Sequence, residues 1–180
     1  MNGIALPLPV EPALWHHFMG LLLVIMLAVM QARIGRIGPF WLICWSFFGT
    51  ALHEATHLFI GILTGGKISG FTVFPHRDTN SGSEGHWILG SVSFSRLGPI
   101  SSLPTGLAPL SLNYFGYYLF QNWYRWFPPD LPHVLLMYLS IYLFAYSSVP
   151  SAQDLKVVFS SLSGLLFYSI LGGGAWFFLH

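Results

Sequence analysis

Residues 53–57 read His-Glu-Ala-Thr-His and lie in the second half of an apolar run that covers residues 40–63. On a helix, His53 and His57 are four residues apart and share one face, so both imidazoles can reach a single metal ion. Glu54 stands beside the first histidine and can reach a water molecule on that ion. The stretch predicts a metal-dependent hydrolytic site in which the two histidines are ligands and Glu54 is the general base.

The composition places this site in a membrane protein. Of the 180 residues, 54% are apolar and 7% are charged, whereas soluble domains carry about 25% charged residues. The net charge of +1 gives no indication of nucleic-acid binding, and the single cysteine, Cys44, excludes a disulfide framework and a thiolate zinc site. We expect one membrane-embedded domain over residues 1–180. Ionisable groups within a membrane-spanning helix cost on the order of 3 kcal/mol each and are as a rule functional.

Hydropathy predicts an α-helical polytopic membrane protein. Its five expected transmembrane helices cover residues 13–32, 40–63, 99–120, 134–149 and 157–179. Gly65 and Gly66 predict the end of the second span. Pro104 and Pro109 predict a kink or an unwound stretch near the start of the third.

A different pattern separates the second and third spans. Residues 91–95 alternate between serine and an apolar residue, residues 71–74 favour a strand, and the polar insert at residues 76–86 supplies a turn. We therefore expect a β-hairpin or small sheet at the membrane surface. Because an open sheet edge cannot face lipid, this sheet should pack on the helices beside residues 53–57.

The third metal ligand is predicted from the order of the spans. A catalytic zinc site has three protein ligands and one open position. The second and fourth spans cross in the same direction, and each has polar residues at its C-terminal end, so Asp154 should lie near the histidine pair. Glu84 and His86 in the polar insert are the alternatives. Asp130 lies at the other end of the fourth span and should be out of reach.

Three segments of the sequence resemble the site-2 protease family of intramembrane metalloproteases, in the order of that family. Residues 53–75 resemble its metal-binding helix and the stretch that leads into its membrane-associated β-region. Residues 97–102, Leu-Gly-Pro-Ile-Ser-Ser, resemble the opening of its next helix, although Ser102 stands where the family has asparagine. Residues 150–154, Pro-Ser-Ala-Gln-Asp, resemble its late segment, whose aspartate is the third zinc ligand.

The resemblance implies a zinc enzyme that hydrolyses peptide bonds of membrane-protein substrates. It assigns Zn²⁺ to His53, His57 and Asp154, and the role of base to Glu54. Substrate contacts are expected from three further residues: Ser102, Asn113 and Ser148. Asn113 has an alternative role as a hydrogen-bond donor to a neighbouring helix.

The resemblance also implies a multi-pass protein of the cell (inner) membrane with its site toward the cytoplasm. With the N-terminus inside, the predicted cytoplasmic loops carry one more basic residue than the outer loops. The lipid bilayer and a membrane-protein substrate are the expected partners, and the sequence does not indicate an oligomeric state. Two other functions stay open: a zinc hydrolase that acts on a non-peptide membrane substrate, and a non-catalytic membrane subunit that holds a structural metal or haem.

Overall fold

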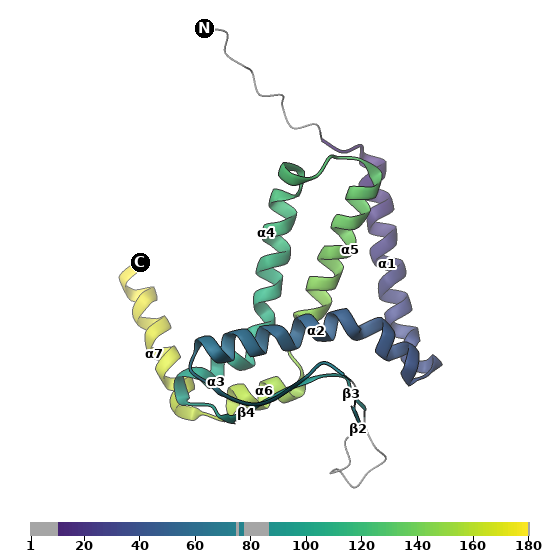
Figure 1. The fold of residues 1–180 in the computed structure, drawn as a ribbon. Coiled ribbons are helices and arrows are strands. Elements are labelled where there is room, and N and C mark those ends of the chain that lie inside the picture. The colour runs from purple at the N-terminus through teal and green to yellow at the C-terminus, as the bar shows by residue number, and fades with distance from the viewer. Residues whose placement is uncertain (1–10, 75, 78–86, 180) are drawn as a thin grey trace.

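A computed structural model describes residues 11–74, 76–77 and 87–179 (Figure 1). The helices and strands are, in chain order, α1 (Leu14–Ile37), α2 (Pro39–Leu63), β1 (Lys67–Thr72), β2 (His76–Arg77), β3 (Trp87–Ile88), β4 (Ser91–Arg96), α3 (Pro99–Gly106), the 3₁₀ turn η1 (Ala108–Leu110), α4 (Ser111–Trp126), α5 (Leu131–Ser147), α6 (Ala152–Phe159) and α7 (Leu162–Leu179).

Two parts of the fold can be distinguished in Figure 1. Helix α5 packs against α1 and α4, and these three helices stand side by side as a bundle. Helix α2 runs across one end of the bundle, where it contacts α1, η1 and α5. Helices α3 and α6 and the strands β1 and β4 lie with α2 at this end. We call α2, α3, α6, β1 and β4 together the end layer.

The long apolar helices indicate a membrane protein, with fewer spans than the five predicted. Two helical stretches, Leu14–Ile34 and Leu162–Leu179, are long and apolar enough to cross a bilayer, and α5 with α6 would make a third if this pair, bent by 51°, counts as one span. Helix α2 is long enough to cross a bilayer but not apolar enough, because the polar residues around its His-Glu-Ala-Thr-His stretch lower its mean hydropathy. It crosses the end of the bundle instead of running alongside it.

The predicted third span is divided into α3, η1 and α4. Pro104 lies inside α3 and Pro109 inside η1. A proline has no N–H group, so each removes one helical hydrogen bond and favours a break. The interruption predicted from the two prolines is therefore confirmed, and it leaves α4 with 16 residues, too short to be counted as a span on its own.

Helix α2 ends where its glycines predicted. Gly65 has φ +83°, a left-handed conformation that glycine adopts without strain. The N–H groups of Gly65 and Gly66 donate to the carbonyls of Ile62 and Gly61 at 3.0 and 2.7 Å. This is a Schellman ending, which satisfies the last carbonyls of the helix and turns the chain into β1.

The small sheet after the second helix is also confirmed. Strands β1 and β4 pair antiparallel, with Lys67 opposite Arg96 and Phe71 opposite Val92. Residues 76–77 and 87–88 form a second short antiparallel pair, β2 with β3. The ring of Phe94 on β4 packs against Gly61 of α2, so the sheet lies on the helix that carries the histidines. The tip of the polar insert, residues 78–86, is outside the described residues.

Candidate metal centre

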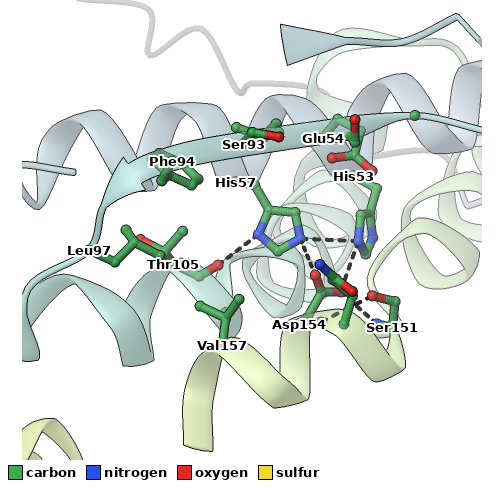
Figure 2. A pocket seen from close by; sticks show the side chains of 15 residues that line it. His53, Glu54, His57, Ser93, Phe94, Leu97, Thr105, Ser151, Asp154 and Val157 are labelled. Atoms are coloured by element: carbon green, nitrogen blue, oxygen red, sulfur yellow. Dashed lines mark hydrogen bonds and ion pairs between the residues drawn. The ribbon is translucent and has the colours of Figure 1, made fainter. Parts of the chain in front are cut away.

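The two histidines of α2 and the aspartate of α6 come together at the middle of the end layer (Figure 2). The Nε2 atoms of His53 and His57 lie 3.1 Å apart. Asp154 places Oδ2 3.1 Å from Nε2 of His53 and Oδ1 3.0 Å from Nε2 of His57. His57 is 6% exposed and Asp154 is 8% exposed. Among the residues that the structure describes, these three form the one group of His, Cys, Asp and Glu arranged to hold a metal ion.

A capping box fixes the position of Asp154. The Ser151 hydroxyl accepts a hydrogen bond from the N–H of Asp154 at 3.2 Å, and Oδ2 of Asp154 accepts one from the N–H of Ser151 at 2.6 Å. This reciprocal pair begins α6 and orders its first turn. The carboxylate therefore faces the histidines from a rigid helix start, and not from a loop.

Backbone carbonyls hold both histidine rings from behind. Nδ1 of His53 lies 2.9 Å from the carbonyl oxygen of Ser147, and Nδ1 of His57 lies 2.7 Å from that of Thr105. A carbonyl oxygen can only accept, so Nδ1 carries the proton in each ring and Nε2 of a neutral ring presents a lone pair. Metal-binding histidines are commonly oriented by such a bond from their other ring nitrogen.

Prolines explain why these two carbonyls are available. The residue four positions after Thr105 is Pro109, which has no N–H to donate back to the Thr105 carbonyl. Helix α5 ends at Ser147, and the N–H four positions after Ser147 belongs to Ser151, which donates to Asp154 instead. Neither carbonyl therefore accepts the usual helical hydrogen bond from the residue four positions later, and each accepts the N–H of a histidine.

The resulting electrostatics favour a cation in the centre. Two Nε2 lone pairs and a carboxylate converge within 3.0–3.1 Å of one another, which is repulsive unless a proton or a metal ion lies among them. In a tetrahedral zinc site with bonds of about 2.0–2.1 Å, adjacent ligand atoms lie about 3.3 Å apart. With one ligand atom taken from each residue, the three atoms lie within 4.8 Å of one another, and two imidazoles and a carboxylate are donors that zinc accepts, so the residues present fit a zinc ion.

Glu54 lies beside this group without belonging to it. It follows His53 on α2 and lines the same cavity, which has a volume of about 460 Å³ (Figure 2). Strand β4, Gly106 and Val157 also line the cavity. A Cβ added to Gly90 would lie only 3.0 Å from Cγ of Glu54, so the glycine lets the chain pass close to this side chain. We call His53, His57 and Asp154 the triad. The cavity has room for a small chemical group and water between Glu54 and the triad.

The other residues named from the sequence lie elsewhere. Ser102 and Ser148 are buried and donate to backbone carbonyls of their own helical turns, and Asn113 is exposed on α4. None of these three lines the cavity, so their contact with a substrate stays a prediction. Asp130 caps the start of α5 and pairs with His133, at the opposite end of α5 from the triad, as expected. Glu84 and His86 are outside the described residues.

Some contributing residues were not identified from the sequence. Ser151 and the carbonyls of Thr105 and Ser147 position the ligands, and Gly90 makes room for Glu54. Ser151 had a readable signal, since a serine three residues before an acidic residue is a capping-box pattern. The carbonyls of Thr105 and Ser147 had a weaker sequence signal, which is the proline that follows each of them within four residues.

Replacing Ser151 by alanine should weaken zinc binding. The variant loses the cap on the N–H of Asp154, which costs about 1 kcal/mol of stability, and loosening an outer-shell partner typically lowers metal affinity 10- to 100-fold. Zinc competition titrations and thermal melts measure both effects. Ser160→Ala is the matched control, because the Ser160 hydroxyl bonds the Val157 carbonyl at the other end of α6. Equal zinc affinity in the two variants would contradict the role given to Ser151.

No protein-family model, curated protein or solved structure matches this chain.

Proposed function

We propose that this protein is an intramembrane zinc metalloprotease that hydrolyses peptide bonds of membrane-protein substrates. One observation carries the proposal: His53, His57 and Asp154 converge from two helices at a cavity that also contains Glu54. Two histidines and one carboxylate, with a position left open, make up a known ligand set of catalytic zinc in peptidases. The resemblance of three segments to the site-2 protease family supports the same reading.

Glu54 is the residue that we expect to move protons. Zinc bound in such a site lowers the pKa of water toward about 7 and polarises carbonyl groups. Of the two carboxylates that line the cavity, Asp154 faces both histidines, which leaves Glu54 as the general base. One of its carboxylate oxygens would accept a proton from the attacking water and return it to the leaving amine.

Strand β4 offers a way to hold the substrate. Residues 91–94 of β4 line the cavity, and within the described part of the chain β4 pairs with β1 alone. A substrate segment must be extended before its carbonyl can reach the metal, and pairing with the other edge of a strand holds a peptide in that form. We therefore propose that the substrate lies along β4 above the triad.

The distribution of basic residues supports a site that faces the cytoplasm. Of the seven Lys and Arg residues, six lie at the end of the bundle occupied by the end layer: Arg33, Arg36, Lys67, Arg77, Arg96 and Lys156. The seventh, Arg125, lies at the other end, in the last turn of α4. By the positive-inside rule the end layer faces the cytoplasm. Because α1 leads into this layer, its N-terminal end then lies outside, the reverse of the sequence-based orientation.

The proposal is tested by metal-dependent cleavage. The purified full chain is reconstituted in vesicles with a panel of quenched fluorescent transmembrane peptides. Chelation with 1,10-phenanthroline should reduce cleavage to background, and added zinc should restore it where calcium does not. Cleavage that survives complete removal of the metal would overturn the proposal. Hydrolysis of lipid amides with no peptide cleaved would favour the non-peptide hydrolase.

A further inference from the structure

A second hollow lies beside the metal cavity and shares no lining residue with it. It has a volume of about 290 Å³ and is formed where α2 ends, β1 begins, β4 ends and α3 begins. Its lining includes Lys67 and Arg96, the first residue of β1 and the last of β4. The mechanism proposed above makes no use of this site.

The two basic residues are paired across the sheet, and the described part of the chain gives neither of them an acidic partner. Lys67 and Arg96 are direct partners in the antiparallel ladder, and like charges in that position destabilise a sheet. Within the described residues, neither forms an ion pair. Of the described carbonyls at the end of α2, none accepts a hydrogen bond from either side chain, and those of residues 60–62 accept the N–H groups of Thr64, Gly65 and Gly66. An anion in the hollow would relieve the repulsion between the two cations.

The hollow also lies at the start of a candidate membrane span. Helix α7 packs against its wall, where the Tyr168 hydroxyl donates to the carbonyl of Ile100 at 2.8 Å. Gly164 lies so close to Pro99 that an added Cβ would be 2.2 Å from the proline oxygen. Both contacts come from the first two turns of α7, so the hollow is level with one end of that span. Lipid headgroups lie where a membrane-spanning helix begins or ends, so the hollow would lie at the level of the headgroups.

Exposed aliphatic residues occur at and next to the hollow. Ile100 lines the hollow and is 56% exposed, and Leu63, just before the lining residue Thr64, is 72% exposed. A basic hollow bordered by exposed aliphatic groups matches a ligand that has a phosphate and hydrocarbon chains. The cytoplasmic surface of a membrane is negatively charged because of its anionic lipids, which attract lysine and arginine residues near the surface.

We propose that Lys67 and Arg96 bind a phosphate group at the membrane surface, supplied by the headgroup of an anionic phospholipid. The guanidinium of Arg96 can bind two phosphate oxygens at once, and the ammonium of Lys67 adds a point charge from the opposite strand. The bound lipid fixes the junction of α2, the sheet and α3 against α7. This inference does not depend on the metal or on its chemistry.

The test titrates the full chain in a neutral detergent with short-chain phosphatidylglycerol, phosphatidylcholine or inorganic phosphate and follows the melting temperature. Phosphatidylglycerol should raise the melting temperature of the unmodified chain, and phosphatidylcholine should not. The double variant Lys67→Gln/Arg96→Gln should bind phosphatidylglycerol about 25-fold more weakly, because each lost charge weakens binding about fivefold. Arg36→Gln/Arg125→Gln removes the same charge elsewhere and should bind it normally. The exchange Lys67→Arg/Arg96→Lys should also retain binding.

The outcomes separate the sources of the phosphate. An equal effect of inorganic phosphate would keep the phosphate site but assign it to the free ion. Unchanged phosphatidylglycerol binding in Lys67→Gln/Arg96→Gln, or an equal loss in Arg36→Gln/Arg125→Gln, would overturn the proposal. Without lipid, the Gln double variant should melt no lower than the unmodified chain, because it loses a repulsion. A lower melting temperature together with unchanged lipid affinity would mean that the pair is structural.

Discussion

Replacing Glu54 by glutamine should leave one zinc ion bound and reduce peptide cleavage by about 10²- to 10⁴-fold, the usual contribution of a general base. The amide has nearly the shape of the carboxylate, so the contacts near Gly90 and Thr50 are preserved. The glutamine amide, unlike the carboxylate, cannot accept a proton from water. The measurement pairs zinc analysis of the purified variant with cleavage of the peptides used for the unmodified chain.

Glu11→Gln is the matched control for this variant. Glu11 is exposed and lies just before α1, far along the chain from the triad, so the same chemical change there should leave cleavage unaltered. Full activity in Glu54→Gln would remove the proposed base. Loss of both zinc and activity would mean that Glu54 belongs to the metal site and not to proton transfer.

Replacing Asp154 by asparagine should reduce zinc affinity by more than about 100-fold, the upper end of the loss caused by removing an outer-shell partner. Asparagine can still accept the hydrogen bond from the N–H of Ser151, so the start of α6 is retained. The change removes the negative charge that faces both histidines. Competition with a zinc chelator gives the affinity, and circular dichroism confirms that the helices remain.

Asp130→Asn is the control for this second change. Asp130 caps α5 at the end opposite to the triad, and its carboxylate also accepts a backbone N–H, from His133. The two aspartates thus have similar capping roles and differ in their distance from His53 and His57. Equal zinc affinity in the two variants would contradict the ligand role of Asp154, while a loss in Asp154→Asn alone would support it.

The proximity of Asp154 to the histidines was predicted correctly, but the helix packing that produces it was not. The hydropathy pattern predicts α2 and α5 as two parallel spans whose polar ends lie level with each other. In the structure, α2 crosses the end of the bundle, and His53 meets the last turn of α5 through the carbonyl of Ser147. Both arrangements bring the segment after α5 to the His-Glu-Ala-Thr-His stretch.

Five spans were predicted because every apolar run was counted as a span. The polar residues of the His-Glu-Ala-Thr-His stretch lower the hydropathy of α2, and the break in the third run leaves α4 with 16 residues. Local signals were more reliable. The glycines at 65 and 66 end α2, Pro109 lies in the 3₁₀ turn that separates α3 from α4, and Pro104 lies in the last turn of α3. Backbone carbonyls accept the hydrogen bonds that orient the histidine rings. Every residue has a backbone carbonyl, so the sequence does not show which carbonyls will bond to the histidines. That depends on the tertiary fold.

The central claim is that His53, His57 and Asp154 bind one divalent cation. It is tested most directly by the metal content of the purified full chain after weakly held ions are removed, together with X-ray absorption at the zinc edge. The account predicts one zinc ion per chain, with nitrogen and oxygen ligands at about 2.0–2.1 Å and no sulfur. A chain that holds no metal, and takes up none when zinc is supplied, would contradict it.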